Sequence, residues 1–162
     1  MAQNEDDMSI DDVYQGLNVI PEGMTERGLI ATTIHYLPPK VRDSLIFGGP
    51  TFLIMQGYQG YYVEVPCSPH HEEKIWELIA LNFTTMKDLS TEEQMDVVAH
   101  EIAHYVLGHH VPTVKNPVSQ EEEKRREIEA DDLCEKWGFR RGYDKSDWPY
   151  TEPPWKAEKA KG

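Results

Sequence analysis

The residues best suited to chemistry lie between positions 100 and 104, which read His-Glu-Ile-Ala-His. Two histidines four residues apart lie on one face of a helix, so the imidazoles of His100 and His104 can both reach a single metal ion. Glu101 lies beside them, where its carboxylate can accept a proton from a water molecule. The spacing therefore predicts a metal site with a general base next to it.

A catalytic zinc takes three protein ligands and leaves a fourth position for water, so a second segment must supply one more side chain. The sequence Glu-Ile-Glu-Ala-Asp at residues 127–131 fits that need. On a helix, Glu127, Ala130 and Asp131 share a face, and the small alanine would allow two helices to approach. We predict Glu127 as the third ligand and Asp131 as the acceptor for the outer nitrogen of a metal-bound histidine. Glu129 would face the opposite way and be solvated.

Other histidines are weaker candidates for the third ligand. His109 and His110 follow His104 by five or more residues, so they would point away from the ion as solvated residues at a helix end, where they favour the dipole. His70 and His71 remain possible ligands, but they precede no motif. Glu127 is therefore preferred over all four.

Both motifs lie in segments with strong helix signals. Ser90 and Glu93 form a capping box that starts a helix at about residue 91 and carries it to about residue 109. Ser119 and Glu122 repeat that pattern for a second helix, which would run to Trp137 before a glycine stop.

The upstream half reads as a helix followed by short strands. Residues 24–37 have a helical apolar face, with an alternating strand pattern as the alternative, and residues 40–45 could add a helical turn. Residues 51–55 and 61–65 are β-prone and flank a glycine-containing turn, which predicts a hairpin. Residues 79–83 predict a further strand. The expected fold is α+β: an N-terminal helix, a small antiparallel sheet and two helices that carry the chemistry.

Length and composition predict one folded domain with extensions. At 162 residues and 39% apolar content, we expect one folded domain over residues 13–145 that carries the predicted metal site. Residues 1–12 are acidic and predict a disordered leader, whereas residues 146–162 are rich in proline, aromatic residues and lysine and predict an extended tail. Its closely spaced aromatic residues further suggest that this tail docks on the domain or on a partner.

The formal net charge of −13 argues against binding to nucleic acid or to anionic membranes, because both need clustered basic residues. No stretch of 18 apolar residues and no secretory signal pattern is present, so we expect a cytoplasmic protein. Cys67 and Cys134 are too far apart for a local metal motif, and we predict that both are reduced, small buried hydrophobes. The oligomeric state is not indicated.

The two motifs together resemble the gluzincin clan of zinc metallopeptidases, and the short spacing between them resembles the ImmA/IrrE-like peptidases and the minigluzincins. The matching residues are His100, Glu101, His104, Glu127 and Asp131. The resemblance implies a zincin-like fold, a Zn²⁺ ion bound by the two histidines and Glu127, and Glu101 as the catalytic base. It also implies that Asp131 orients a ligand histidine, with His100 the preferred partner.

By the same resemblance, the substrate is a protein or peptide whose extended main chain pairs with an edge strand. Residues 79–83 are the expected edge because they directly precede the first motif helix. Alternatives to a metalloprotease are a zinc-binding interaction module of the same fold without turnover, and a metal-dependent hydrolase of a non-peptide substrate. An intact Glu101 favours an enzyme, because a purely structural site needs no base.

Overall fold

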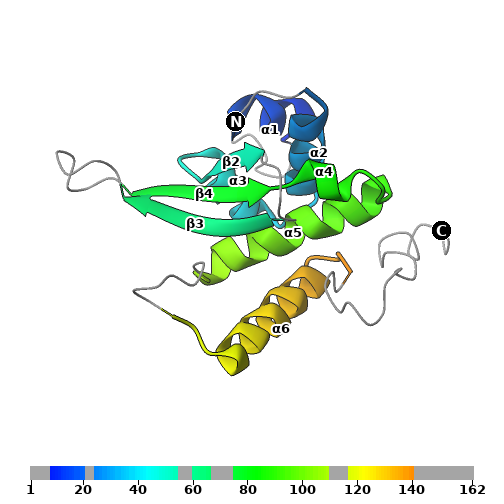
Figure 1. Ribbon diagram of the computed structural model, residues 1–162. Coiled ribbons are helices and arrows are strands. Elements are labelled where there is room, and N and C mark those ends of the chain that lie inside the picture. Colours follow the sequence, from blue (N-terminus) through cyan, green and yellow to red (C-terminus); the bar gives the residue numbers. More distant parts are fainter. Residues whose placement is uncertain (1–7, 21–23, 55–59, 67–74, 110–116, 141–162) are drawn as a thin grey trace.

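The computed structural model describes residues 8–20, 24–54, 60–66, 75–109 and 117–140. Figure 1 shows how its helices and strands are arranged. In chain order they are α1 (Ile10–Gly16), β1 (Asn18–Ile20), α2 (Met24–His35), α3 (Pro39–Ile46), β2 (Thr51–Ile54), β3 (Gly60–Pro66), β4 (Ile75–Leu81), α4 (Phe83–Met86), α5 (Thr91–Leu107) and α6 (Gln120–Lys136).

The sheet corrects the expectation of a small antiparallel sheet. Its strand order is β1-β2-β4-β3, and β1, β2 and β4 run parallel to one another. β3 alone is antiparallel, with Tyr62 opposite Ile79 on β4. The predicted hairpin between residues 51–55 and 61–65 is therefore wrong, because β4 lies between β2 and β3.

The position of β4 has a physical cause in its sequence. Ile79, Ala80 and Leu81 are consecutive and all fully buried, so both faces of the strand are covered. A strand that is apolar on both sides belongs in the centre of a sheet, where it can pair with two neighbours. β4 is thus not the edge strand expected for residues 79–83, and the strand ends at Leu81, because Asn82 caps the short helix α4.

Helix starts follow the predicted capping signals. The Ser90 hydroxyl accepts a hydrogen bond from the Glu93 N–H, and the Glu93 carboxylate accepts one from the Ser90 N–H at 2.7 Å, so the capping box of α5 is complete. Ser119 likewise caps α6 by accepting from the Glu122 N–H. The Glu122 carboxylate, however, pairs with Arg125 and Arg126 on the same helix instead of completing a second box.

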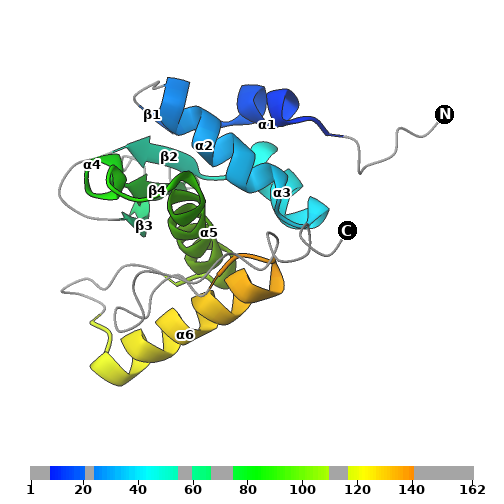
Figure 2. The same ribbon diagram turned by 90° about the vertical axis from the view of Figure 1, so that its right-hand side faces the viewer.

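Helix α5 lies at the centre of the molecule. It packs against α2, α6, β3 and β4, and Figures 1 and 2 show it between the sheet and α6. Nine consecutive residues, 95–103, are buried along it. The apolar core gathers around this helix and includes Ile30, Phe52, Ile79, Ile102 and Phe139. The residues that carry the first motif are therefore fixed by the core itself.

The N-terminal elements brace this core. The Arg27 guanidinium on α2 donates hydrogen bonds to the carbonyls of Tyr14 and Leu17, both at 2.9 Å, and so ties α1 to α2. Helix α1 begins at Ile10, so the last part of the predicted leader, residues 1–12, is helical. The rest of that leader and the predicted tail, residues 146–162, lie outside the described residues apart from positions 8 and 9. Within the part that is described, no helix is long and apolar enough to cross a membrane.

Candidate metal centre

Three predicted ligands converge between α5 and α6. The Nε2 atoms of His100 and His104 are 3.0 Å apart. One carboxylate oxygen of Glu127 lies 3.1 Å from His100 Nε2, and the other lies 3.4 Å from His104 Nε2. His100 is buried, His104 is nearly so, and the Glu127 side chain is 43% exposed, so the group opens to solvent on the α6 side. These three residues form the group in the described structure that could hold a metal ion.

The spacing of these atoms fits a bound cation. Atoms bonded to a tetrahedral zinc at about 2.0–2.1 Å lie about 3.3 Å from one another. Two separations lie close to that value, 3.0 Å between the two Nε2 atoms and 3.1 Å from His100 Nε2 to one Glu127 oxygen, while His104 Nε2 lies 3.4 Å from the other oxygen. Two imidazole nitrogens and a carboxylate also form the donor set of many catalytic zinc sites. The residues present therefore fit such an ion in both chemistry and spacing.

Asp131 holds the outer side of His100. One of its carboxylate oxygens lies 3.0 Å from His100 Nδ1. Because a carboxylate can only accept, Nδ1 carries a proton, and a bound cation would take the place of the second proton at Nε2. Burial opposes a charge on His100, but the carboxylates of Asp131 and Glu127 outweigh it and raise its pKa to about 10. The site thus favours positive charge at this ring.

Glu101 lies within the buried part of the site, and its exposed fraction is 8%. Burial raises the pKa of its carboxyl group, while His100 and His104 act in the opposite direction. Glu127 shows the reverse balance: burial works against ionisation, but hydrogen bonds to the two histidines hold its pKa well below the usual range. The two glutamates therefore differ as an acid–base group and a permanent anion should differ.

His109 and Glu129 are placed differently from the prediction. His109 Nδ1 lies 3.1 Å from His104 Nδ1, and His109 Nε2 lies 3.1 Å from a Glu129 carboxylate oxygen. The His109 side chain is 10% exposed, so it is not the solvated helix-end residue expected from the sequence. Burial, followed by the neighbouring His104, lowers its pKa. Glu129 is likewise engaged, with Arg125 on its other oxygen at 2.6 Å.

His109 is not solvated because α5 ends at Leu107, before the helix end expected at about residue 109. Gly108 adopts φ +69°, which turns the chain back on itself. The His109 N–H bonds to the His104 carbonyl at 2.9 Å and the Gly108 N–H bonds to the Tyr105 carbonyl at 3.0 Å, which is the Schellman pattern. That pattern brings the side chains of His109 and His104 together. Gly108 followed by His109 was the signal in the sequence that could have indicated this contact.

Small buried side chains bring α6 against α5. Ala130 and Cys134 are fully buried, and Asp131 is 9% exposed. Burial raises the pKa of the free Cys134 thiol well above its usual value, which agrees with its prediction as a small buried hydrophobe. Cys67, His70, His71 and His110 lie outside the described residues.

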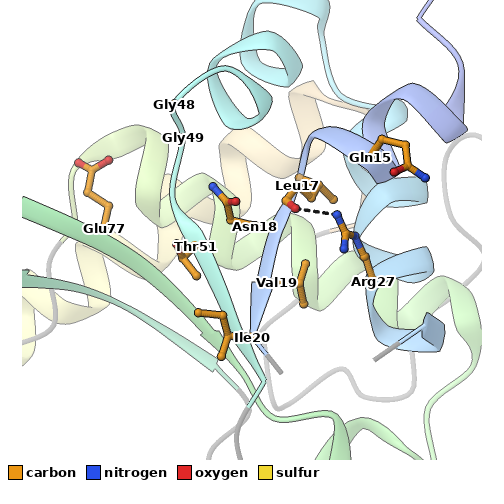
Figure 3. Close-up of a pocket in the computed structure, with 10 residues that line it drawn as sticks. All are labelled: Gln15, Leu17, Asn18, Val19, Ile20, Arg27, Gly48, Gly49, Thr51 and Glu77. Carbon is orange, nitrogen blue, oxygen red and sulfur yellow. Dashed lines mark hydrogen bonds between the residues drawn. The ribbon is translucent and has the colours of Figure 1, made fainter. Parts of the chain in front are cut away.

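A separate pocket of about 650 Å³ lies beside β1 and β2 and is drawn in Figure 3. Its lining includes Asn18, Thr51, Arg27 and Glu77, and none of the three grouped ligands. The Glu77 carboxylate accepts a hydrogen bond from the Tyr105 hydroxyl at 3.0 Å, and burial raises the pKa of that phenol to about 12. Among the described residues, the candidate metal ligands thus lie at the α5–α6 contact, apart from this pocket.

Comparison of the chain with protein-family models, with curated proteins and with solved structures found no match.

Proposed function

We propose that the protein is a zinc metallopeptidase whose centre is the group of His100, His104 and Glu127. The observation that carries the proposal is the convergence of these three side chains from two helices, with a buried glutamate directly after the first histidine. A purely structural zinc site has four protein ligands and no neighbouring base. Three ligands and a base match a catalytic site better.

The chain's own residues divide the work in this proposal. When bound, zinc lowers the pKa of water at its open position and polarises the substrate carbonyl. Glu101 accepts the proton of the attacking water and passes it to the leaving amine. Burial raises the pKa of this carboxyl group and the two histidines act in the opposite direction, and such opposed influences are typical of groups that both accept and donate a proton. Asp131 keeps the Nε2 atom of His100 directed at Glu127 and His104.

The substrate class is a protein or peptide. Among the described strands, β3 forms the edge of the sheet next to β4 and packs against α5, so an extended substrate would pair with β3 and not with β4. With a charge of −13, the chain is not expected to bind nucleic acid or an anionic membrane. We place the enzyme in the cytoplasm, a reducing compartment in which a free thiol such as Cys134 persists.

The decisive experiment compares wild type with Glu101→Gln and His104→Ala. Each is assayed for bound zinc by elemental analysis and for cleavage of a fluorescence-quenched peptide library. Glu123→Gln, an exposed change of the same kind on α6, is the matched control. Glu101→Gln should keep zinc and lose ~10²–10⁴-fold in cleavage rate, because only proton transfer is removed. His104→Ala should lose both.

The remaining outcomes separate the alternatives. Zinc binding with no cleavage by wild type would indicate an interaction module or a hydrolase of another substrate. Full zinc content in His104→Ala would refute the metal assignment. Cleavage by Glu101→Gln at the wild-type rate would refute the mechanism.

A further inference from the structure

We propose that His109 and Glu129 are positioning residues that hold His104 in the orientation and tautomer needed to bind the metal. The inference rests on the zinc site proposed above and extends it to two residues outside the motif. It starts from an asymmetry: Asp131 contacts His100 directly, whereas His104 contacts a carboxylate at its outer nitrogen only through a second imidazole.

The proton positions follow from counting donors and acceptors. The Glu129 carboxylate can only accept, so His109 Nε2 donates to it across 3.1 Å. A neutral His109 then has a free electron pair at Nδ1 and accepts a hydrogen bond across 3.1 Å from His104 Nδ1. With its proton at Nδ1, His104 would have Nε2 available for a metal ion held beside Glu127 and His100 Nε2.

This chain of contacts does for His104 what Asp131 does for His100. A metal-bound histidine usually donates its other N–H to a carboxylate, carbonyl or water, which fixes the ring and strengthens the ligand. Here an imidazole and then a carboxylate fill that place. Further contacts position both residues. The turn at Gly108 places the His109 backbone, and Arg125 donates a hydrogen bond to the second carboxylate oxygen of Glu129.

The arrangement also joins the two helices at a second point. His109 follows α5, and Glu129 lies on α6 two residues beyond the ligand Glu127. Helix α6 thus supplies a ligand, a partner for His100 and a partner for the residue behind His104. The contact with His109 differs from the sequence-based expectation that Glu129 faces the opposite way and is solvated.

The test is zinc affinity, measured by competition with a chromophoric chelator, together with the unfolding of the metal-free protein in urea. His109→Ala should weaken zinc about 10–100-fold, the usual cost of losing an outer partner of a ligand. Glu129→Ala should weaken it less. Glu123→Gln, exposed on the same helix, should bind like wild type. The metal-free unfolding midpoint should change little in any variant that supports the proposal.

A double-mutant cycle and a rescue variant make the test specific. If His109 and Glu129 act on His104 through one chain of hydrogen bonds, Glu129→Ala should have no further effect on zinc affinity once His109 is alanine. His109→Asn places a carbonyl oxygen near the former Nδ1 position and can still accept from His104. It should restore most of the affinity and make Glu129 unimportant.

The outcomes separate this inference from the proposed function. Two results would refute the roles of His109 and Glu129 while leaving the zinc site intact. One is wild-type zinc affinity in His109→Ala; the other is an equal loss of affinity from Glu129→Ala with His109 present or replaced by alanine. Absence of zinc from wild type would instead refute the proposed zinc site, on which this inference depends. Peptidase activity is not needed for any of these measurements.

Discussion

Helices α5 and α6 have the same length and the same type of N-cap, but they are held in place in different ways. Both span 17 residues and begin after a capping serine. α5 is buried along nine consecutive residues, whereas only Ala130, Asp131 and Cys134 are buried on α6. α5 therefore belongs to the core. α6 packs on the surface of that core through a narrow stripe of three buried residues.

The difference matters because the metal centre needs both helices. α5 supplies His100, His104 and the proposed base Glu101, of which His100 and Glu101 are buried. α6 supplies Glu127, Asp131 and Glu129, which engage the histidine rings from outside. A rigid helix therefore presents the histidines, and a lightly packed helix completes the site. The proposed function therefore depends on a helix with few buried residues.

The largest expected effect comes from core truncation on each helix. Ile102→Ala on α5 removes a fully buried side chain and should cost about 2–5 kcal/mol in the free energy of unfolding. Leu133→Ala on α6 removes a partly buried one and should cost less than about 2 kcal/mol, because less apolar area returns to water. Urea unfolding of the metal-free variants measures both. Equal losses would show that α6 is as deeply integrated as α5.

Much of α5 and α6 could be predicted because their signals are local. Ser90, Glu93 and Ser119 mark helix starts through contacts within one turn, and the structure confirms them. The order of the sheet strands is a long-range property. β4 lies inside the sheet, and its residues Ile79, Ala80 and Leu81 are all buried. The same sequence could also be interpreted as an alternating pattern with only one face buried. β1, α1 and α4 are too short to give a clear pattern.

The site was predictable to the same extent. Helical geometry alone predicts that His100 and His104 lie on one face of a helix. It likewise predicts that Glu127 and Asp131 share a face of the second helix. His109 did not follow, because its position depends on a left-handed glycine that reverses the chain. Roles as ligand or base remain predictions, since geometry shows proximity and not turnover.

A second effect concerns the contact between Asp96 on α5 and Arg140, a residue that follows α6. Asp96 on α5 is buried and accepts hydrogen bonds from the Arg140 backbone N–H and guanidinium, both at 3.2 Å. Burial raises the Asp96 pKa from 3.8 to about 6, partly offset by Arg140, while Glu93 adds to the rise. The folded protein therefore binds this proton more tightly than the unfolded chain. The resulting stability is fully present below pH 3.8 and is lost as the pH rises through about 6.

Asp96→Asn isolates that contribution. The complete rise corresponds to about 3 kcal/mol, of which about 1 kcal/mol should be lost between about pH 5 and pH 7 in wild type relative to the variant. Urea unfolding of both metal-free proteins across that range gives the difference curve. Parallel curves would mean that Asp96 is not protonated more readily in the fold and that Arg140 alone sets its charge.

The smallest effect tests whether the two capping serines differ as their helices do. Ser90 takes part in two reciprocal hydrogen bonds, whereas Ser119 accepts one from the Glu122 N–H. Each substitution by alanine frees one backbone N–H, that of Glu93 or Glu122, and should cost about 0.5–1 kcal/mol, with the larger cost at Ser90 because its hydroxyl belongs to a reciprocal pair. Asparagine at either site, which retains a cap, should restore most of the loss. A larger loss at Ser119 would show that the start of α6 contributes more to its docking than the buried stripe and would reverse the contrast between the helices.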